Sequence, residues 1–184
     1  MRSQILLIAL ACVAALRGEE LALHLDPARI TVNFTLPATL HTVHGSFKLK
    51  RGAIRFDPAT GRISGEVAID ATSGNSDNES RDKRMHKDVL ASGRYPEIVF
   101  VPDRVDGVVA PAGDSHVQVH GTFRIHGADH EITVPVNVHM ASGQATVIAR
   151  FAIPYVKWGM KNPSNLLLHV GDQVEIAVSA VALP

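Results

Sequence analysis

The sequence predicts an all-β domain, an antiparallel eight-stranded barrel with a short helical lid segment. Hydrophobic residues alternate with period two over most of the chain, and turn-forming residues separate the alternating runs. One stretch, residues 73–94, breaks the alternation and spaces its apolar residues as a helix does. At 184 residues and 19.8 kDa the chain suits one well-buried domain. We expect that domain over residues 19–184, behind a signal peptide in residues 1–18.

The N-terminus has the features of a secretory signal peptide. Arg2 precedes an apolar run over residues 5–16, and Arg17 follows it. About a dozen apolar residues fall short of the roughly twenty that span a bilayer as a helix, so no transmembrane segment is expected in the mature protein. The sole cysteine, Cys12, lies in this segment, so the mature domain can form no internal disulfide. The expected location is periplasmic or secreted, and a lipid anchor on Cys12 is the less favoured alternative.

The composition of the chain argues against two classes of binding partner. Hydrophobic residues make up 46% of the chain and charged residues 20%, which is ordinary for a globular protein. Lys plus Arg and Asp plus Glu are equal at 18 each. With no overall positive excess, neither nucleic acid nor an anionic membrane surface is an expected partner.

The strands follow from the alternation, which is clearest in residues 116–125. There Val117 and Val119 share one face, and His116 and Gln118 share the other. The remaining predicted strands centre on these apolar positions: Ile30, Val32 and Phe34; Phe47, Leu49 and Phe56, with a break near Arg51 and Gly52; Ile63, Val67 and Ile69; Ile98 and Phe100; Ile132, Val134, Val136 and Val138; Val147, Ala149, Phe151 and Ile153; Val174, Ile176 and Val178.

Turn residues between these runs predict a meander of hairpins. Pro135 lies inside one strand and lacks an N–H donor, so we expect a sheet edge or a bulge there. The predicted turns contain Asp57, Pro58 and Gly61; Asp106 and Gly107; Gly127 and Asp129; Ser142 and Gly143; Gly171 and Asp172.

Residues 73–94 predict a short helix or ordered flap between two strands. Met85, Val89 and Leu90 have helical spacing, and Asn78 and Ser80 precede them as candidate caps. Three apolar residues on such an insertion suit a lid over one end of the sheet. A surface helix pinned to the core is the alternative.

The inward residues indicate an elongated apolar channel. Strands of about nine or ten residues, at roughly 3.3 Å each, extend about 30 Å. The interior of an eight-stranded barrel holds either side chains or one small ligand. Here the inward residues are mainly Val, Ile, Ala and Gly, and the chain has one Trp. Two packed sheets with a filled core remain an alternative, because period two does not distinguish a sandwich from a barrel.

The candidate ligand-binding residues are inward-facing, on the lid, or at a rim. Arg81 and Asp82 form either a polar rim for a ligand head group or an exposed ion pair worth under about 1 kcal/mol. Trp158, Lys161 and Asn162 form either a second rim or a packed corner. The candidates are Phe34, Phe47, Val67, Met85, Leu90, Phe100, Val119, Phe123, Val134, Phe151 and Trp158.

Catalytic and metal chemistry find little support. Histidines four apart on one strand are about 13 Å distant, too far to share one ion. Only His41, His44 and His86 suggest a group that could converge. There is no Gly-x-Ser-x-Gly motif and no cysteine outside the signal. We expect no enzyme, no metal site and no required cofactor.

Several stretches occur in one characteristic order along the chain: residues 39–47, Ser80, Arg81, Asp82, Met85, His86, Val89, Leu90, residues 95–100, residues 121–127, and residues 155–164 with Trp158, Gly159, Met160, Lys161, Asn162 and Pro163. In these stretches the chain resembles the YceI-like family of bacterial exported proteins. The resemblance implies a lipocalin-like barrel, periplasmic or secreted, that binds and carries a polyisoprenoid or isoprenoid quinone in its lumen. A structural or stress-related barrel with a filled core is the alternative function, and a homodimer is left open. The resemblance covers nearly all the mature chain, from about residue 24 to the end.

Overall fold

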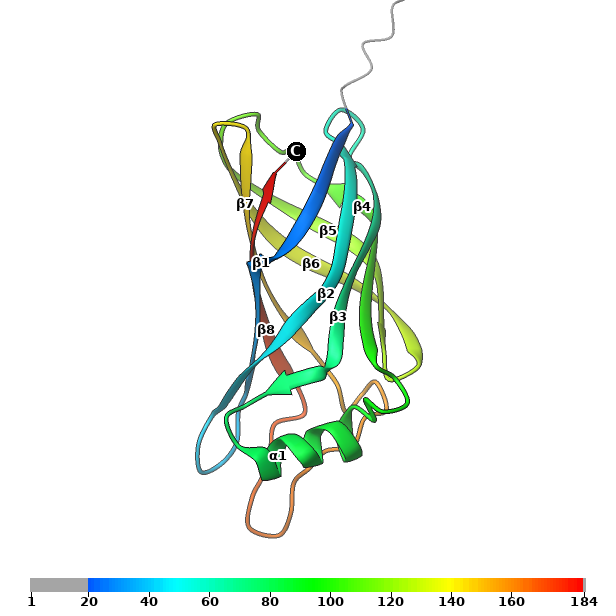
Figure 1. Cartoon of the computed structure of the whole chain (residues 1–184), viewed down its shortest axis with the longest axis vertical. Helices are drawn as coiled ribbons and strands as arrows, with labels where there is room; N and C mark the ends of the chain where they lie inside the picture. The colour runs from blue at the N-terminus through cyan, green and yellow to red at the C-terminus, as the bar shows by residue number, and fades with distance from the viewer. Residues whose placement is uncertain (1–19, 184) are drawn as a thin grey trace, which may run out of the picture.

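The computed structural model describes residues 20–183, which form a closed antiparallel barrel with its eight strands in chain order (Figure 1). The predicted barrel with a short helical lid segment is therefore confirmed. The predicted signal peptide and Cys12 lie outside the described residues. The strands are β1 (Leu21–Leu36), β2 (Val43–Asp57), β3 (Arg62–Asn75), β4 (Glu97–Asp106), β5 (Gly113–Ile125), β6 (Ala128–Ala141), β7 (Gln144–Ile153) and β8 (Val174–Leu183), and the helices are α1 (Glu79–Arg84) and the π-helical turn η1 (Met85–Val89).

Along the strands, side chains alternate between the lumen and the solvent as the sequence pattern predicts. In β5, Val117 and Val119 are buried, and the neighbouring His116 and Gln118 are exposed. The predicted break near Arg51 is also present, because the register between β2 and β3 shifts there. The period-two pattern therefore identifies the wall of the barrel and the side of each residue.

Two strand boundaries differ from the prediction. The structure begins β1 at Leu21, although the predicted strand centres on residues 30–34. Residues 73–75, expected in the flap, continue β3. In the first case Leu21 and Leu23 already face the lumen, so the alternation starts earlier than expected.

Pro135 produces no bulge, but it lies where β6 has an edge without pairing to β7. The register between β5 and β6 runs without a shift past Pro135, which lies opposite Gln118. The pairing between β6 and β7, however, covers only residues 136–141 of β6. Because proline has no N–H to donate, it fits the point where this ladder stops. The expected bulge is wrong, and the edge is limited to the first half of one strand.

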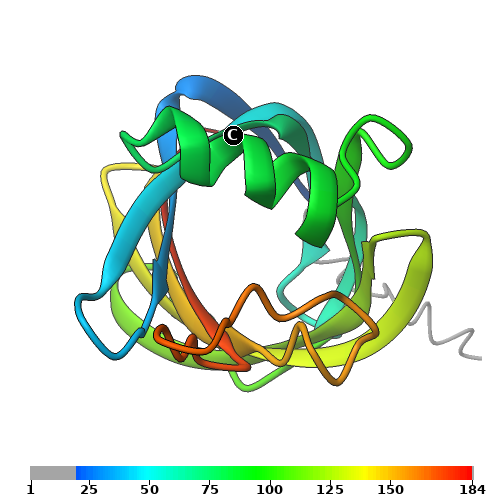
Figure 2. The ribbon, with the colours of Figure 1, turned by 90° about the horizontal axis from the view of Figure 1, so that it is seen from below.

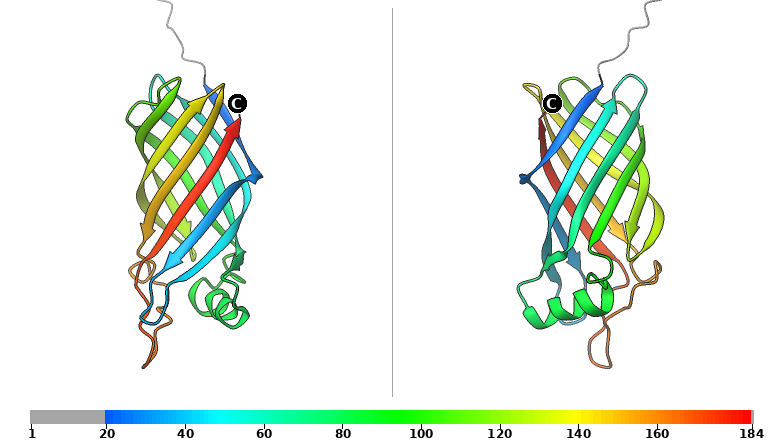
Figure 3. Two further views of the ribbon diagram at one scale, coloured as in Figure 1. Left: turned by 90° about the vertical axis from the view of Figure 1, so that its left-hand side faces the viewer. Right: turned by 45° about the vertical axis from the view of Figure 1, so that its right-hand side comes forward.

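The barrel has two unlike ends. We call the lid end the one that carries residues 37–42, 76–96, 126–127 and 154–173, and the far end the one with the three remaining hairpin loops (Figure 3). Seen onto the lid end, α1 lies along one side of the opening and residues 154–173 lie along the opposite side (Figure 2). In the described part of the chain, no helix is long and apolar enough to cross a membrane.

Candidate functional site

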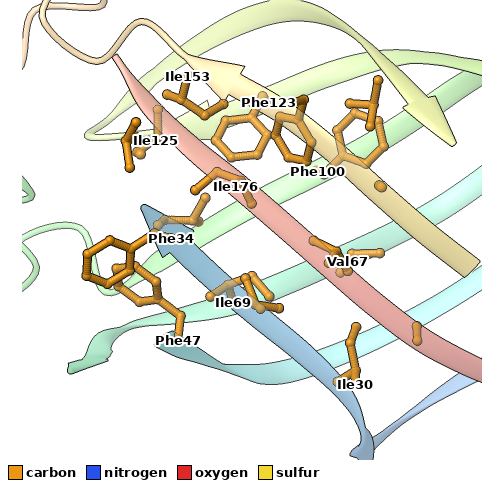
Figure 4. A pocket seen from close by; sticks show the side chains of 18 of the residues that line it. Ile30, Phe34, Phe47, Val67, Ile69, Phe100, Phe123, Ile125, Ile153 and Ile176 are labelled. Atoms are coloured by element: carbon orange, nitrogen blue, oxygen red, sulfur yellow. The ribbon is translucent and has the colours of Figure 1, made fainter. Parts of the chain in front are cut away.

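A cavity of about 850 Å³ occupies the lumen, and all eight strands contribute to its wall. Figure 4 shows its aromatic and branched aliphatic lining, in which the rings of Phe34 and Phe47 pack 5.4 Å apart. Every candidate ligand-binding residue except Trp158 lines this cavity: Phe34, Phe47, Val67, Met85, Leu90, Phe100, Val119, Phe123, Val134 and Phe151.

The polar side chains of the wall gather at the lid end. Tyr155 is a special case, because its hydroxyl already donates a hydrogen bond to the Gly171 carbonyl oxygen at 2.7 Å. Burial raises the pKa of Tyr155 to about 12, so it stays neutral. The rest of the wall along the strands is apolar. Besides Tyr155, the polar lining residues of the lid end are His41, Ser76, Asn78, Ser80, Arg81 and Arg84.

Ser76 organises the start of the lid. Its hydroxyl accepts from Arg81 Nε at 2.7 Å, and its carbonyl oxygen accepts from the same guanidinium at 2.5 Å. Asp82 accepts from the backbone N–H of Ser76 at 3.1 Å and from its hydroxyl. Ser76 is itself buried. One alternative predicted an exposed ion pair between Arg81 and Asp82, and this is wrong. Both side chains instead bind Ser76 and so fasten the lid to the end of β3.

The helix of the lid begins as its sequence predicts. Asn78 is the N-cap residue, and its side-chain oxygen accepts from the backbone N–H of Arg81 at 3.0 Å. Met85, Val89 and Leu90 line the cavity. The insertion therefore covers the lumen, as the lid interpretation predicts, and is not merely a surface helix.

The three histidines singled out for metal binding have other partners or lie apart. His86 contacts Ser92 Oγ at 3.1 Å and the Gly74 carbonyl oxygen at 2.9 Å. His44 contacts Thr35 Oγ1 at 3.2 Å. Among residues 20–183 there is no group of three or more His, Cys, Asp or Glu side chains placed to hold a metal ion.

Trp158 is not among the residues that line the cavity. Its ring stacks on His130, with centroids 4.1 Å apart and planes 3° from parallel, beside the half of β6 that lacks pairing to β7. Its other neighbour, Phe123, lines the cavity and is paired with His130 across β5 and β6, so Trp158 packs against the inward face of the wall. Because Trp158 lies in a connection that has no period, its sequence position gave no information on whether its ring reaches the cavity.

The other members of the predicted second rim have separate roles. Asn162 accepts from the Ser164 backbone N–H at 2.9 Å and donates to the Val170 carbonyl oxygen at 3.1 Å, as a packed corner would. Lys161 lines a small polar pocket of about 260 Å³ together with Arg84 and Asp88. Since Arg84 also lines the lumen, this pocket adjoins the mouth of the cavity.

Comparison with known proteins adds an independent finding. The profile of the YceI-like domain matches residues 23–182. The crystal structure of BcnA from Burkholderia cenocepacia is similar, with a TM-score of 0.70 and 21% identity over 87% of this chain and 99% of that one.

Two further solved structures share the fold. A polyisoprenoid binding domain from Saccharophagus degradans, implicated in plant cell wall breakdown, has a TM-score of 0.67 and 17% identity over 88% of this chain and 97% of its own. The YceI protein of Campylobacter jejuni has a TM-score of 0.65 and 18% identity over 78% of this chain and 85% of its own. A comparison with curated protein sequences gave no match.

Proposed function

The chain belongs to the YceI-like family, and from this premise we propose that it binds one long apolar isoprenoid lipid, a polyisoprenoid or an isoprenoid quinone, in the barrel lumen. The observation that carries the proposal is the lumen cavity of about 850 Å³ with its apolar wall. The similar Saccharophagus degradans structure, described as a polyisoprenoid binding domain, supports the choice of lipid class. An open cavity of this size counts against the alternative of a barrel with a filled core.

The shape of the cavity favours a chain over a compact ligand. Its volume is in the upper part of the roughly 300–1,000 Å³ range of small-molecule sites. The 13 residues of β5, rising about 3.4 Å each and tilted by about 40°, make a wall roughly 30 Å high. A tall, narrow and apolar space suits an extended hydrocarbon tail.

Tail burial should dominate the affinity. Each buried methylene is worth about 0.8 kcal/mol, whereas one hydrogen bond at the rim is worth about 1 kcal/mol. Part of the gain is offset by ordering the chain. Affinity should therefore follow tail length more than head group. The polar side chains at the lid end support a position of the head group at that end.

Binding without catalysis and export from the cytoplasm belong to the same proposal. In the described lumen wall, the hydroxyl of Ser76 is engaged by Asp82 and Arg81, so it is not poised as a nucleophile. The signal-like N-terminus supports a carrier in the periplasm or outside the cell. No cofactor besides the lipid is required by this role.

Mass spectrometry of an organic-solvent extract tests the ligand. Protein purified from its native envelope should release a prenyl lipid in near-equal molar amount, chemically unchanged after prolonged incubation. A lipid-free extract from folded protein would contradict the proposal, and a processed lipid would indicate an enzyme.

Intact-mass measurement of the native protein tests export. We expect a mature chain that starts between Cys12 and Leu21 in the extracytoplasmic fraction. Met1 retained on cytoplasmic protein contradicts export, and a diacylated Cys12 indicates a membrane anchor instead.

A further inference from the structure

We propose that the lid end of the barrel is a membrane-docking surface, whose loop tips insert among the lipids of an anionic bilayer. The proposal rests on the proposed function in one respect, since a carried lipid must leave and enter a bilayer. Four features of the lid end support it: three exposed leucines, the turn that holds two of them, their connection to the lumen and the local charge.

Three leucine side chains at the lid end are exposed to solvent. Leu40 is 75% exposed, Leu166 is 99% exposed and Leu167 is 85% exposed. Leu40 lies in the loop between β1 and β2, and the other two lie in residues 154–173, the segment that extends furthest beyond the lid (Figures 1 and 3). Single exposed apolar residues are common, but several on adjacent loops mark an interaction site.

An ordered turn presents these leucines. The side-chain oxygen of Asn165 accepts from the backbone N–H groups of Leu167 and Leu168, both at 2.9 Å. The backbone N–H of Asn165 donates to the carbonyl oxygen of Leu168 at 2.9 Å. The exposed side chains of Leu166 and Leu167 therefore project from a hydrogen-bonded turn.

The turn is also joined to the loop that carries Leu40. The backbone N–H of Thr39 donates to the His169 carbonyl oxygen at 2.9 Å, and Thr39 Oγ1 accepts from the His169 N–H at 3.2 Å. Ala38 and Val170 form a β-bridge between the same segments. The two loops thus present their leucines as one unit, which we call the leucine tip (Leu40, Leu166 and Leu167).

The leucine tip is continuous with the lumen. Leu168, next to Leu167, lines the cavity, and so do Ala38 and His41 on either side of the Leu40 position. A lipid tail could move from a bilayer around the tip into the lumen along the apolar side chains of Ala38 and Leu168. This continuity favours a bilayer as the occupant.

Local charge favours an anionic bilayer. Residues 76–96 and 154–173 together contain seven Lys and Arg against five Asp and Glu, whereas the far-end loops, residues 58–61, 107–112 and 142–143, contain none of either. The zero net charge of the chain conceals this local excess. Arg84, Lys87 and Lys161 take part in none of the ion pairs of the described residues. Apolar side chains flanked by free cations are the pattern of interfacial binding to anionic lipids.

Vesicle co-sedimentation tests the proposal. The probes are vesicles of phosphatidylcholine alone and of phosphatidylcholine with phosphatidylglycerol. The variant is Leu166→Ser with Leu167→Ser, and the control is Val108→Ser, because Val108 is 79% exposed at the far end. We expect wild type and control to bind the anionic vesicles, less so at high salt, and the double variant to bind at least about tenfold more weakly. Since both leucines are exposed, circular dichroism and the melting temperature should not change.

Three outcomes overturn the proposal: no vesicle binding by the wild type, equal loss in the variant and the control, or self-association of the wild type that the double variant abolishes in the absence of vesicle binding. Solvent extraction of the same samples separates this proposal from the proposed function. A double variant that keeps its lipid but loses vesicle binding supports docking. Protein that binds vesicles but yields no lipid contradicts lipid carriage and leaves docking standing.

Discussion

The two ends of the barrel share one wall but differ in what their loops add. At the far end the loops are short and uncharged, and Ser142 and Gly143, both with positive φ, form the tight turn that suits a two-residue hairpin. At the lid end, residues 37–42, 76–96 and 154–173 contribute the polar lining, the lid and the leucine tip. The strands therefore enclose the cavity for a ligand. The long connections at one end contribute the polar residues that can recognise a ligand and surround the opening through which it can enter.

Blocking the lumen between the two ends should have the largest effect. Val119 faces the cavity and Gln118 faces solvent on the same strand. Replacing Val119 with Trp should remove most of the bound lipid, at a cost of about 1–3 kcal/mol from overpacking, and Gln118→Trp should do neither. Lipid extracted per folded protein, judged by circular dichroism, gives the answer. Equal losses, or none in either variant, would mean that the assignment of faces or of the ligand is wrong.

Loosening the lid should have the next largest effect. Ser76→Ala deprives the partly buried Arg81 and Asp82 of a shared partner, and we expect a loss of about 1–3 kcal/mol in the free energy of unfolding. The far-end control is Thr60→Ala, which removes an exposed hydrogen bond to Asp57 and should cost within about 0.5 kcal/mol. Chemical denaturation measures both. Hydrogen exchange in α1 should become faster in Ser76→Ala alone. Unchanged exchange there would contradict the role of Ser76 in fastening the lid.

Two matched hairpin glycines sharpen the comparison further. Gly127 at the lid end has φ of 78°, and Gly143 at the far end has φ of 75°. Alanine at either position should cost about 1–2 kcal/mol because of the left-handed backbone. At Gly127 the added Cβ would also come within 2.4 Å of the Tyr95 ring, whereas nothing lies within 4 Å of it at Gly143. Gly127→Ala should therefore cost at least about 1 kcal/mol more.

The excess at Gly127 is checked with a double-mutant cycle. In a Tyr95→Ala background the clash disappears, so the two glycine variants should differ little in their free energies of unfolding. An excess that persists in this background would contradict the packing explanation.

Acid sensitivity should differ modestly between the two ends of β4. The hydrogen bond from Arg51, and then that from Lys50, lower the pKa of Glu97 from 4.5 to about 2. This carboxylate therefore stabilises the fold above about pH 4.5, and its contribution is lost as the pH falls toward 2. The pKa of Asp106 at the far end is lowered as well, chiefly by Arg104. The melting temperature, measured over the acid range, should depend less steeply on pH in Glu97→Gln than in Asp106→Asn. A dependence on pH that is unchanged from wild type in both variants would contradict this.

Metal removal should have the smallest effect, which is none. The histidine contacts of the lid, such as His86 with Ser92 and Gly74, involve groups of the protein itself. Dialysis against a strong chelator should leave the melting temperature unchanged. A drop restored by zinc would point to His41, His44 and His86.

The alternation predicts the wall well and the lid end poorly. Faces are readable because side chains alternate along a strand, so Val119 and Phe151 were assigned to the lumen correctly. The start of β1 was readable from Leu21 and Leu23 but was missed. The positions of Trp158 and Arg84 relative to the cavity could not be predicted, because a connection has no period that indicates which way a residue faces. Ser76 needed the fold, since its partners converge only when β3 and α1 meet.

Closure of the ring by β1 and β8 has a consequence for folding. It pairs Leu25 with Ala182, almost the whole described chain apart, so this contact bears the largest loop-closure entropy and should form late. Until it forms, both strands expose unpaired edges that are prone to aggregation. The same open stage leaves the lumen accessible from the side. A prenyl lipid present during refolding can therefore be enclosed as the last seam closes, without passing the lid.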